Sequence, residues 1–318
     1  MILYQFSLFV KDSAINYSII SCYVLVYFCI LLYNKENYII LQNGERKMPR
    51  IIKINDINAP ELAVYTSLTE SQLKRDEKLF IAESVKVIEV ALDKGLEAVS
   101  FLMEERQIEG IAKDIIKRCP NVPVYTADRN TLSSLTGFEL TRGVLCAMKR
   151  PERKSLKEVL SGAKRVAVLE RLSDAVNVGA IFRSAAALGM DAVLLYNNCS
   201  EPLNRRSVRV SMGSVFLVPW AFFDKEDFPS PENAVQYLKE SGFITAAMAL
   251  KYDTLGIDSP ILTTSEKLAL FLGSEGEGLS ENTIKCCDYT VKIPMSNGVD
   301  SLNVAAAAAV SFWQLGNK

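Results

Sequence analysis

The first half of the sequence alternates short apolar runs with stretches in which apolar and polar residues recur at helical spacing. The expected strands are residues 79–83, 98–103, 122–127 and 143–149. The expected helices lie near residues 84–94, 108–118 and 128–135. The pattern predicts a small α/β unit, followed by a charged, proline-containing linker at 151–158.

A second α/β unit is expected after the linker. Its strands are predicted at residues 165–170, 192–196, 243–248, 268–273 and 290–294. Several of these runs are apolar throughout, which is typical of parallel strands covered by helices on both faces. The chain then ends in an alanine-rich helix for which Ser301 is the expected N-cap.

The N-terminal 47 residues differ from the rest of the chain. Residues 13–34 carry no charge, and 19–33 are almost wholly apolar, although that run falls short of the roughly 20 residues of a membrane-spanning helix. The segment is a membrane anchor, an additional ordered element, or the product of a misassigned start. No basic region precedes the apolar run, which argues against a signal peptide. We favour the last interpretation, with Met48 as the first residue, because residues 48–56 read like the start of a cytosolic protein and nothing downstream needs the extension.

Charge and cysteine content narrow the class of protein. The 318 residues carry a net charge of −1, so any contact with nucleic acid must come from local basic clusters. The seven cysteines form no CxxC pair, and the chain has no histidine, which argues against a zinc site. Their odd number and scatter favour a reduced, cytoplasmic protein without a bound metal.

The stretch 174–190 places an arginine inside a helix that begins near Asn177. Val178, Ile181, Phe182, Ala185 and Gly189 would share the buried face of this helix, with Arg183 roughly opposite. Gly179 would let another backbone or a ligand approach closely, and Asn177 would act as a cap or a polar ligand group. The simpler alternative is a solvated arginine on a surface helix.

Two later loops also carry candidate chemistry. The glycine loop 271–280 lacks the phosphate-binding signatures, and Glu275 and Glu277 would repel a pyrophosphate, so a neutral or cationic ligand fits better. Further on, Ser301 and Asn303 lie at the start of the last helix, where capping would account for Ser301 but poorly for Asn303. All three stretches follow predicted parallel strands, and that edge of a sheet binds ligands in open α/β folds.

Taken together, these stretches resemble the motifs of the SpoU/TrmH family of RNA ribose 2′-O-methyltransferases, in the SPOUT superfamily. The matching residues are Asn177, Gly179 and Arg183 in the first motif, Gly273, Glu275, Gly278, Leu279 and Ser280 in the second, and Ile293, Pro294, Met295 and Ser301 to Val304 in the third. The chain departs from the family pattern at Ala175, Val176, Asn297 and Ala305. Residues 79–95 are also similar to the small substrate-binding domain of the family.

The resemblance implies an α/β fold with a C-terminal trefoil-knot methyltransferase domain at 159–318 and a smaller α/β RNA-binding domain at 48–150. It implies S-adenosylmethionine as cofactor, RNA as substrate and a homodimer with the site near its interface. The implied catalytic residues are Arg183, Asn177, Glu275, Ser301 and Asn303, and the implied cofactor-binding residues are Gly273, Ile293, Leu302, Met295 and Met248. Arg183 would act either as the base or as an orienting, charge-stabilising group, because a free guanidinium stays protonated.

RNA contacts are expected from two basic clusters. Arg205, Arg206 and Arg209 would partly share a helix face, and Lys74 and Arg75 precede the small domain. Ribosomal RNA is favoured over tRNA because of the extra N-terminal domain. Two rival functions are a non-catalytic RNA-binding protein of the same fold and an NAD- or nucleotide-dependent enzyme; the glutamates of the glycine loop disfavour the latter.

Overall fold

The structure is a computed structural model that describes residues 49–54, 56, 59–66, 69–129, 132–133, 143–196, 198–250, 254–274 and 276–317. The apolar extension 1–47, most of the predicted helix 128–135 and the candidate residue Glu275 lie outside these ranges. No helix of the described ranges is both long and apolar enough to span a bilayer.

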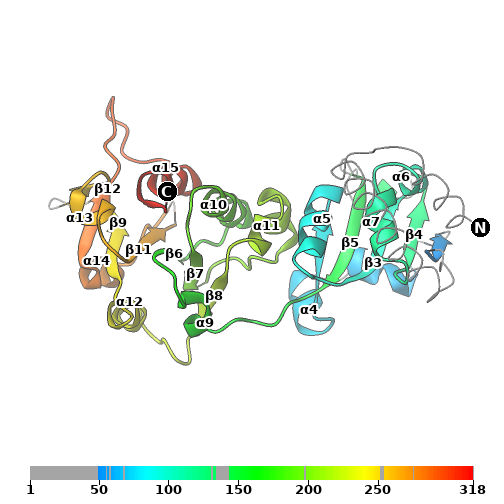
Figure 1. Ribbon diagram of the computed structural model, residues 1–318, viewed down its shortest axis with the longest axis horizontal. Helices are drawn as coiled ribbons and strands as arrows, with labels where there is room; N and C mark the ends of the chain where they lie inside the picture. Colours follow the sequence, from blue (N-terminus) through cyan, green and yellow to red (C-terminus); the bar gives the residue numbers. More distant parts are fainter. Residues whose placement is uncertain are drawn as a thin grey trace, which may run out of the picture. The chain divides into compact units, whose positions relative to one another are not determined.

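The first sheet has five strands in the order β1-β4-β3-β5-β2 (Figure 1). They are β1 (Ile51–Lys53), β2 (Leu79–Glu83), β3 (Ala98–Glu104), β4 (Val124–Ala127) and β5 (Val144–Lys149). β4 pairs in parallel with β1 and β3, whereas β5 runs antiparallel to β2 and β3. The sequence therefore predicted four of these strands closely and missed β1.

Helices cover both faces of this sheet. They are α3 (Ala63–Thr66), α4 (Glu70–Arg75), α5 (Val85–Asp93), α6 (Glu105–Ile108) and α7 (Lys113–Arg118), with a 3-10 turn, η1, at Pro60–Leu62. The single helix expected near 108–118 is wrong: the chain forms α6 and α7 instead. Gly110, a poor helix former, lies in the break between them.

The second sheet has seven parallel strands in the order β10-β12-β9-β11-β6-β7-β8. They are β6 (Arg165–Glu170), β7 (Ala192–Tyr196), β8 (Trp220–Phe223), β9 (Ile244–Met248), β10 (Leu255–Gly256), β11 (Leu268–Gly273) and β12 (Tyr289–Lys292). The five apolar runs of the sequence match β6, β7, β9, β11 and β12. The strands β8 and β10, at the two edges of the sheet, were not predicted.

Helices pack on both faces of the second sheet, as the apolar strands require. Alternate side chains of β6 divide between the two faces: Ala167 and Leu169 join the core under α10 and α15, and Val166 and Val168 join the core under α12. The helices are α9 (Leu156–Leu160), α10 (Ala175–Ala187), α11 (Arg205–Val210), α12 (Pro231–Glu240), α13 (Pro260–Thr263), α14 (Glu281–Cys286) and α15 (Val304–Leu315), with a 3-10 turn, η2, at Ser214–Phe216.

Three local predictions are corrected by this arrangement. The predicted linker 151–158 is shorter, because a capping box between Ser155 and Glu158 starts α9 inside it. Asp174, not Asn177, caps α10 through a bond from the Val176 amide. Gly189 is not on the buried face of α10, because the helix ends at Ala187 and Gly189 follows with a φ of +76°.

Candidate active site

A pocket of about 620 Å³ opens at the carboxyl ends of β9, β11 and β12. Its walls come from three separate stretches of the chain, around Met248, around the glycine loop after β11, and from Val291 to Ala307. The five residues expected to bind a cofactor all line it: Met248, Gly273, Ile293, Met295 and Leu302. Ser301 and Asn303 line it as well, so the second and third motifs form one cavity.

The glycine loop is folded tightly against the end of β11. The Gly278 amide donates to the Ser274 carbonyl at 2.9 Å, and Gly278 has a φ of +67°. A Cβ atom at Gly273 would overlap the backbone of Gly278 and Leu279. Only glycine at position 273 permits this close approach of backbone to backbone, which shapes one wall of the pocket.

The charge of the pocket suits a cationic ligand. Among the described residues that line it, Glu277, Glu281 and Asp300 are acidic, whereas Lys292 is the single basic residue. Leu272, Ile293 and Leu302 supply apolar surface beside these charges. These side chains therefore suit a ligand that has an apolar part and a positive charge, and they oppose a polyphosphate. Glu275 falls outside the described residues.

Asn303 caps the last helix and joins it to α10. Its side-chain oxygen accepts hydrogen bonds from the amides of Ala305 and Ala306 at 3.0 and 3.4 Å. Its Nδ2 donates to Oδ1 of Asn177 at 3.2 Å. The expectation that Ser301 caps this helix is therefore wrong. Asn303 is the N-cap, although the sequence made it the less obvious candidate. Ser301 is left exposed at the pocket wall.

The bond between Asn177 and Asn303 joins the first motif to the pocket wall. Asn177 is 7% exposed in the first turns of α10. A Cβ at Gly179 would lie 2.6 Å from the carbonyl oxygen of Ser207, so the expected close approach is made by the backbone of α11. Arg183 follows Asn177 by six residues, a rise of about 9 Å along the helix, and does not line the pocket.

Arg183 is exposed on the outer side of α10, as its spacing predicted. Its guanidinium forms neither an ion pair nor a hydrogen bond with any residue in the described part of the chain. One copy of the chain therefore assembles the second and third motifs with Asn177, and leaves Arg183 facing outward nearby.

The predicted basic clusters have other partners. Arg205 and Arg209 both pair with Glu83 of β2, at 3.2 and 3.4 Å. Glu83 is 2% exposed and the Arg205 side chain 20%, so Arg205 is engaged by a carboxylate of the chain itself, and its contact with RNA stays a prediction. Lys74 pairs with Glu201, and Arg75 with Asp76 at 2.7 Å. Arg206 and Arg75 remain exposed.

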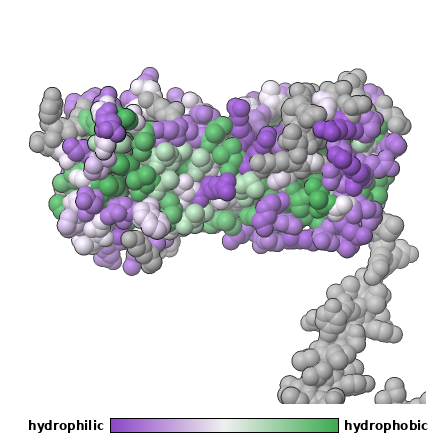
Figure 2. Space-filling view, turned by 90° about the horizontal axis from the view of Figure 1, so that it is seen from above, coloured by the Kyte–Doolittle hydropathy of each residue, from purple (hydrophilic) through white to green (hydrophobic). Residues whose placement is uncertain are grey.

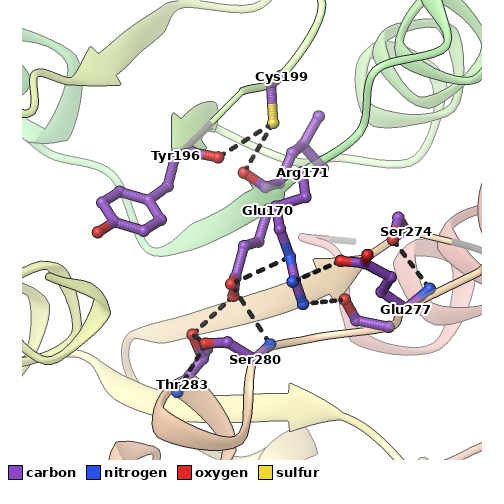
Figure 3. A network of polar contacts seen from close by, with 10 residues as sticks. Glu170, Arg171, Tyr196, Cys199, Ser274, Glu277, Ser280 and Thr283 are labelled. Carbon is purple, nitrogen blue, oxygen red and sulfur yellow. Dashed lines mark hydrogen bonds and ion pairs between the residues drawn. The ribbon is translucent and has the colours of Figure 1, made fainter.

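Sequence reasoning missed a polar network behind the glycine loop (Figure 3). Glu170, 1% exposed at the end of β6, accepts hydrogen bonds from Oγ1 of Thr283 at 2.6 Å and from the amide of Ser280 at 3.3 Å. Its neighbour Arg171 reaches Glu277 and the carbonyl of Gly278. The signal was present in the sequence as a charged pair that closes an otherwise apolar strand, 165–170.

Comparisons with known proteins agree on one family. The profile of the SpoU rRNA Methylase family matches residues 164–313. An uncharacterized tRNA/rRNA methyltransferase of Mycobacterium bovis is 37% identical over 267 residues, which cover 84% of this chain and 88% of that protein. The 23S rRNA (guanosine(2553)-2′-O)-methyltransferase of Bacillus subtilis is 28% identical over 229 residues, 69% of this chain and 87% of that protein.

A solved structure shares the fold. The AdoMet-bound rRNA methyltransferase of Sinorhizobium meliloti aligns with a TM-score of 0.70 and 23% identity, over 83% of this chain and 97% of that one. The mixed α/β architecture of the two sheets is therefore one already seen in this class of protein.

Proposed function

The chain belongs to the SpoU rRNA Methylase family, and from that premise we propose that it transfers a methyl group from S-adenosylmethionine to a ribose 2′-hydroxyl of RNA. The observation that carries the proposal is the convergence of the second and third motifs on one acidic, partly apolar pocket. Ribosomal RNA is the favoured substrate, since the B. subtilis relative is named for 2′-O-methylation of 23S rRNA.

Different pocket residues would contact different parts of the cofactor. Backbone groups of Gly273, Ile293 and Leu302 would hold the adenosine part, and Met248 and Met295 would pack against it. The surrounding carboxylates tolerate a positive charge. When bound, S-adenosylmethionine supplies an electrophilic methyl group on a sulfonium.

Arg183 would reach the reacting hydroxyl in a homodimer. The outer side of α15 exposes Val310 (40%) and Trp313 (70%), and Leu302 at the pocket rim is 40% exposed. Figure 2 shows hydrophobic surface interrupting the hydrophilic one over the part of the chain that carries the seven-stranded sheet. We propose that this surface is buried against a second copy, with α10 of one copy placed over the pocket of the other.

The reaction must also remove the proton of the ribose hydroxyl, and the chain has no histidine to accept it. A guanidinium stays protonated below about pH 12, so Arg183 would donate hydrogen bonds to the oxygen as negative charge develops on it. This stabilisation favours loss of the proton to water. Asn303, held by Asn177, and Ser301 would orient the ribose.

Substitution of Arg183 tests the proposal. We expect Arg183→Ala to lower the rate of 2′-O-methylation of ribosomal RNA at least about a hundredfold, the usual effect of removing a group that stabilises developing charge. Methylation is read from labelled S-adenosylmethionine and from mapping of alkali-resistant positions. Affinity for S-adenosylmethionine, measured by calorimetry, serves as the control and should not change.

Mixing two inactive variants tests the shared site. In a mixture of Arg183→Ala and Gly273→Val chains, about a quarter of the wild-type activity should return, because half of randomly formed dimers are hybrids with one complete site. If no activity returns, Arg183 acts within its own chain. A wild-type protein that binds RNA and S-adenosylmethionine but leaves every RNA unmethylated would favour the non-catalytic alternative.

A further inference from the structure

Arg171 occupies an unusual backbone position directly behind the pocket. It follows Glu170, the last residue of β6, and has a φ of +58°. This left-handed conformation is unfavourable for a residue with a long side chain and suits glycine. Strain of this kind persists where the surrounding contacts hold the residue in place, so the contacts of Arg171 need an explanation.

The guanidinium of Arg171 joins three groups. Nη1 donates to Oε2 of Glu277 at 2.7 Å, and Nη2 donates to the carbonyl oxygen of Gly278 at 3.1 Å. Nε lies 3.7 Å from Oε1 of Glu170. Figure 3 shows the carboxylate of Glu277 turned toward the guanidinium. A planar fork with several donors can serve a carboxylate and a carbonyl together, whereas an ammonium group is a point charge.

Both direct partners belong to the pocket wall. Ser274, Glu277, Gly278 and Leu279 line the cavity, and the bond from the Gly278 amide to the Ser274 carbonyl closes the turn that carries Glu277. The far end of the loop is fixed separately, since Glu170 binds the Ser280 amide and Thr283 at the start of α14. Arg171 thus connects the middle of the glycine loop, at Glu277 and Gly278, to the end of β6.

We propose that Arg171 is a positioning residue for the cofactor: it latches the glycine loop through Glu277 and Gly278 and thereby sets the affinity of the pocket for S-adenosylmethionine. This proposal rests on the proposed function. The latch holds the wall in the bound shape before the cofactor arrives, so less ordering is needed on binding. It also keeps the Glu277 carboxylate paired at the rim of the pocket.

Replacement of Arg171 by glycine separates the latch from general stability. Glycine suits the left-handed backbone, and this relief of strain offsets part of the cost of the lost bonds, so the ligand-free Arg171→Gly protein should remain folded, which thermal melting without ligand checks. Its affinity for S-adenosylmethionine and for S-adenosylhomocysteine, measured by calorimetry, should fall about tenfold, the effect of losing charge-assisted hydrogen bonds. Arg171→Lys should lose less, about threefold, because one ammonium replaces the fork.

A matched control is available in the small domain. Lys78 has a φ of +53° and lies outside the pocket. Lys78→Gly makes the same backbone change and should leave both affinities unaltered. Glu277→Gln should weaken binding, and adding it to Arg171→Gly should weaken binding little further, because both remove one interaction.

Amide hydrogen exchange distinguishes failure of the latch from failure of the proposed function. In ligand-free Arg171→Gly protein, the amides of Glu277, Gly278 and Leu279 should exchange faster than in wild type, whether or not any cofactor binds. Unchanged exchange, or wild-type affinity in this variant, would overturn the latch. Wild-type protein that binds neither S-adenosylmethionine nor S-adenosylhomocysteine would overturn the proposed function, and the exchange rates would still decide the latch.

Discussion

Single residues in the site act mainly through backbone geometry. Gly273 lets the glycine loop touch the end of β11, and Asn303 uses one amide to cap α15 and to hold Asn177. Neither role involves a charged side chain. The shape of the pocket therefore depends on backbone packing and on uncharged side chains, so substitutions that add or remove a single atom group at these positions should strongly change cofactor binding.

The two neighbouring glycines of the loop give a matched pair of substitutions. A Cβ at Gly273 overlaps the backbone of Gly278 and Leu279, whereas a Cβ at Gly276 meets no atom within 4 Å. We expect Gly273→Ala to lower the affinity for S-adenosylmethionine at least tenfold and to cost about 1–3 kcal/mol of stability, as overpacking does. Calorimetry and urea denaturation measure both effects.

Gly276→Ala is the control for this pair and should bind and unfold like wild type. If both variants bind equally well, the loop adjusts freely and close packing at Gly273 does not shape the pocket.

Residue types in the site were easier to predict than their geometry. The family resemblance implied site roles for Gly273, Ile293, Met295, Ser301, Leu302 and Asn303, and Met248 was added from its place at the end of a strand; all seven residues line one pocket. The cap of α15 was misassigned, because Ser and Asn cap equally well and only the backbone decides between positions 301 and 303. Arg171 was missed, because its partners are far away in sequence.

Among the elements, buried parallel strands were predicted best. Their apolar runs reflect coverage on both faces, so β6, β7 and β11 stand out in the sequence. The edge strands β8 and β10 were missed, because β8 is mixed in burial and β10 has two residues. Periodicity reports burial, and it is weak where an element is short or half-covered.

A carboxylate anchors the start of β12 to β9. Asp288 accepts hydrogen bonds from the amide and hydroxyl of Thr245 at 2.9 and 2.8 Å and pairs with Lys239 at 2.9 Å. Burial alone would raise its pKa, but the bonds from Lys239 and Thr245 outweigh that effect, so the pKa of Asp288 lies below its ordinary value. The folded state therefore prefers the ionised group.

This preference has a defined pH dependence. A lowered folded pKa stabilises the protein above the unfolded pKa of about 4, and the contribution disappears as the pH falls through the folded value. We expect Asp288→Asn to cost about 1 kcal/mol at pH 7, a small value because the pair is partly exposed to solvent. Urea denaturation should show the difference between the two proteins shrinking below pH 4. A difference that stays constant down to pH 2 would contradict this account.

At the scale of the whole molecule, the two sheets share a continuous hydrophobic core. Phe80 of β2 packs against Phe216 at a centroid distance of 5.6 Å. Beside this contact, the buried carboxylate of Glu83 lies between Arg205 and Arg209 of α11. The division into domains at 48–150 and 159–318 stays a prediction, as does the trefoil knot, because strand order and pairing describe neighbours in a sheet and not the threading of the chain.

The Glu83 contact should matter more than a surface ion pair. Glu83→Ala removes a carboxylate that is 2% exposed and that pairs with both Arg205 and Arg209, and we expect a loss of about 3 kcal/mol. The control is Glu97→Ala, which should cost less than about 1 kcal/mol because Glu97 and its partner Lys149 are both largely exposed. Thermal and urea unfolding compare the two. Equal losses would show that the buried pair has no special weight.

The pocket draws every one of its walls from residues beyond Ala247. A nascent chain leaving the ribosome therefore contains the whole small sheet and the strands β6, β7 and β8 of the large one before any residue that lines the pocket has been added. Methyl transfer therefore has to wait for the segment that is translated last, and a product of an interrupted message that ends before residue 248 would lack every residue that lines the pocket.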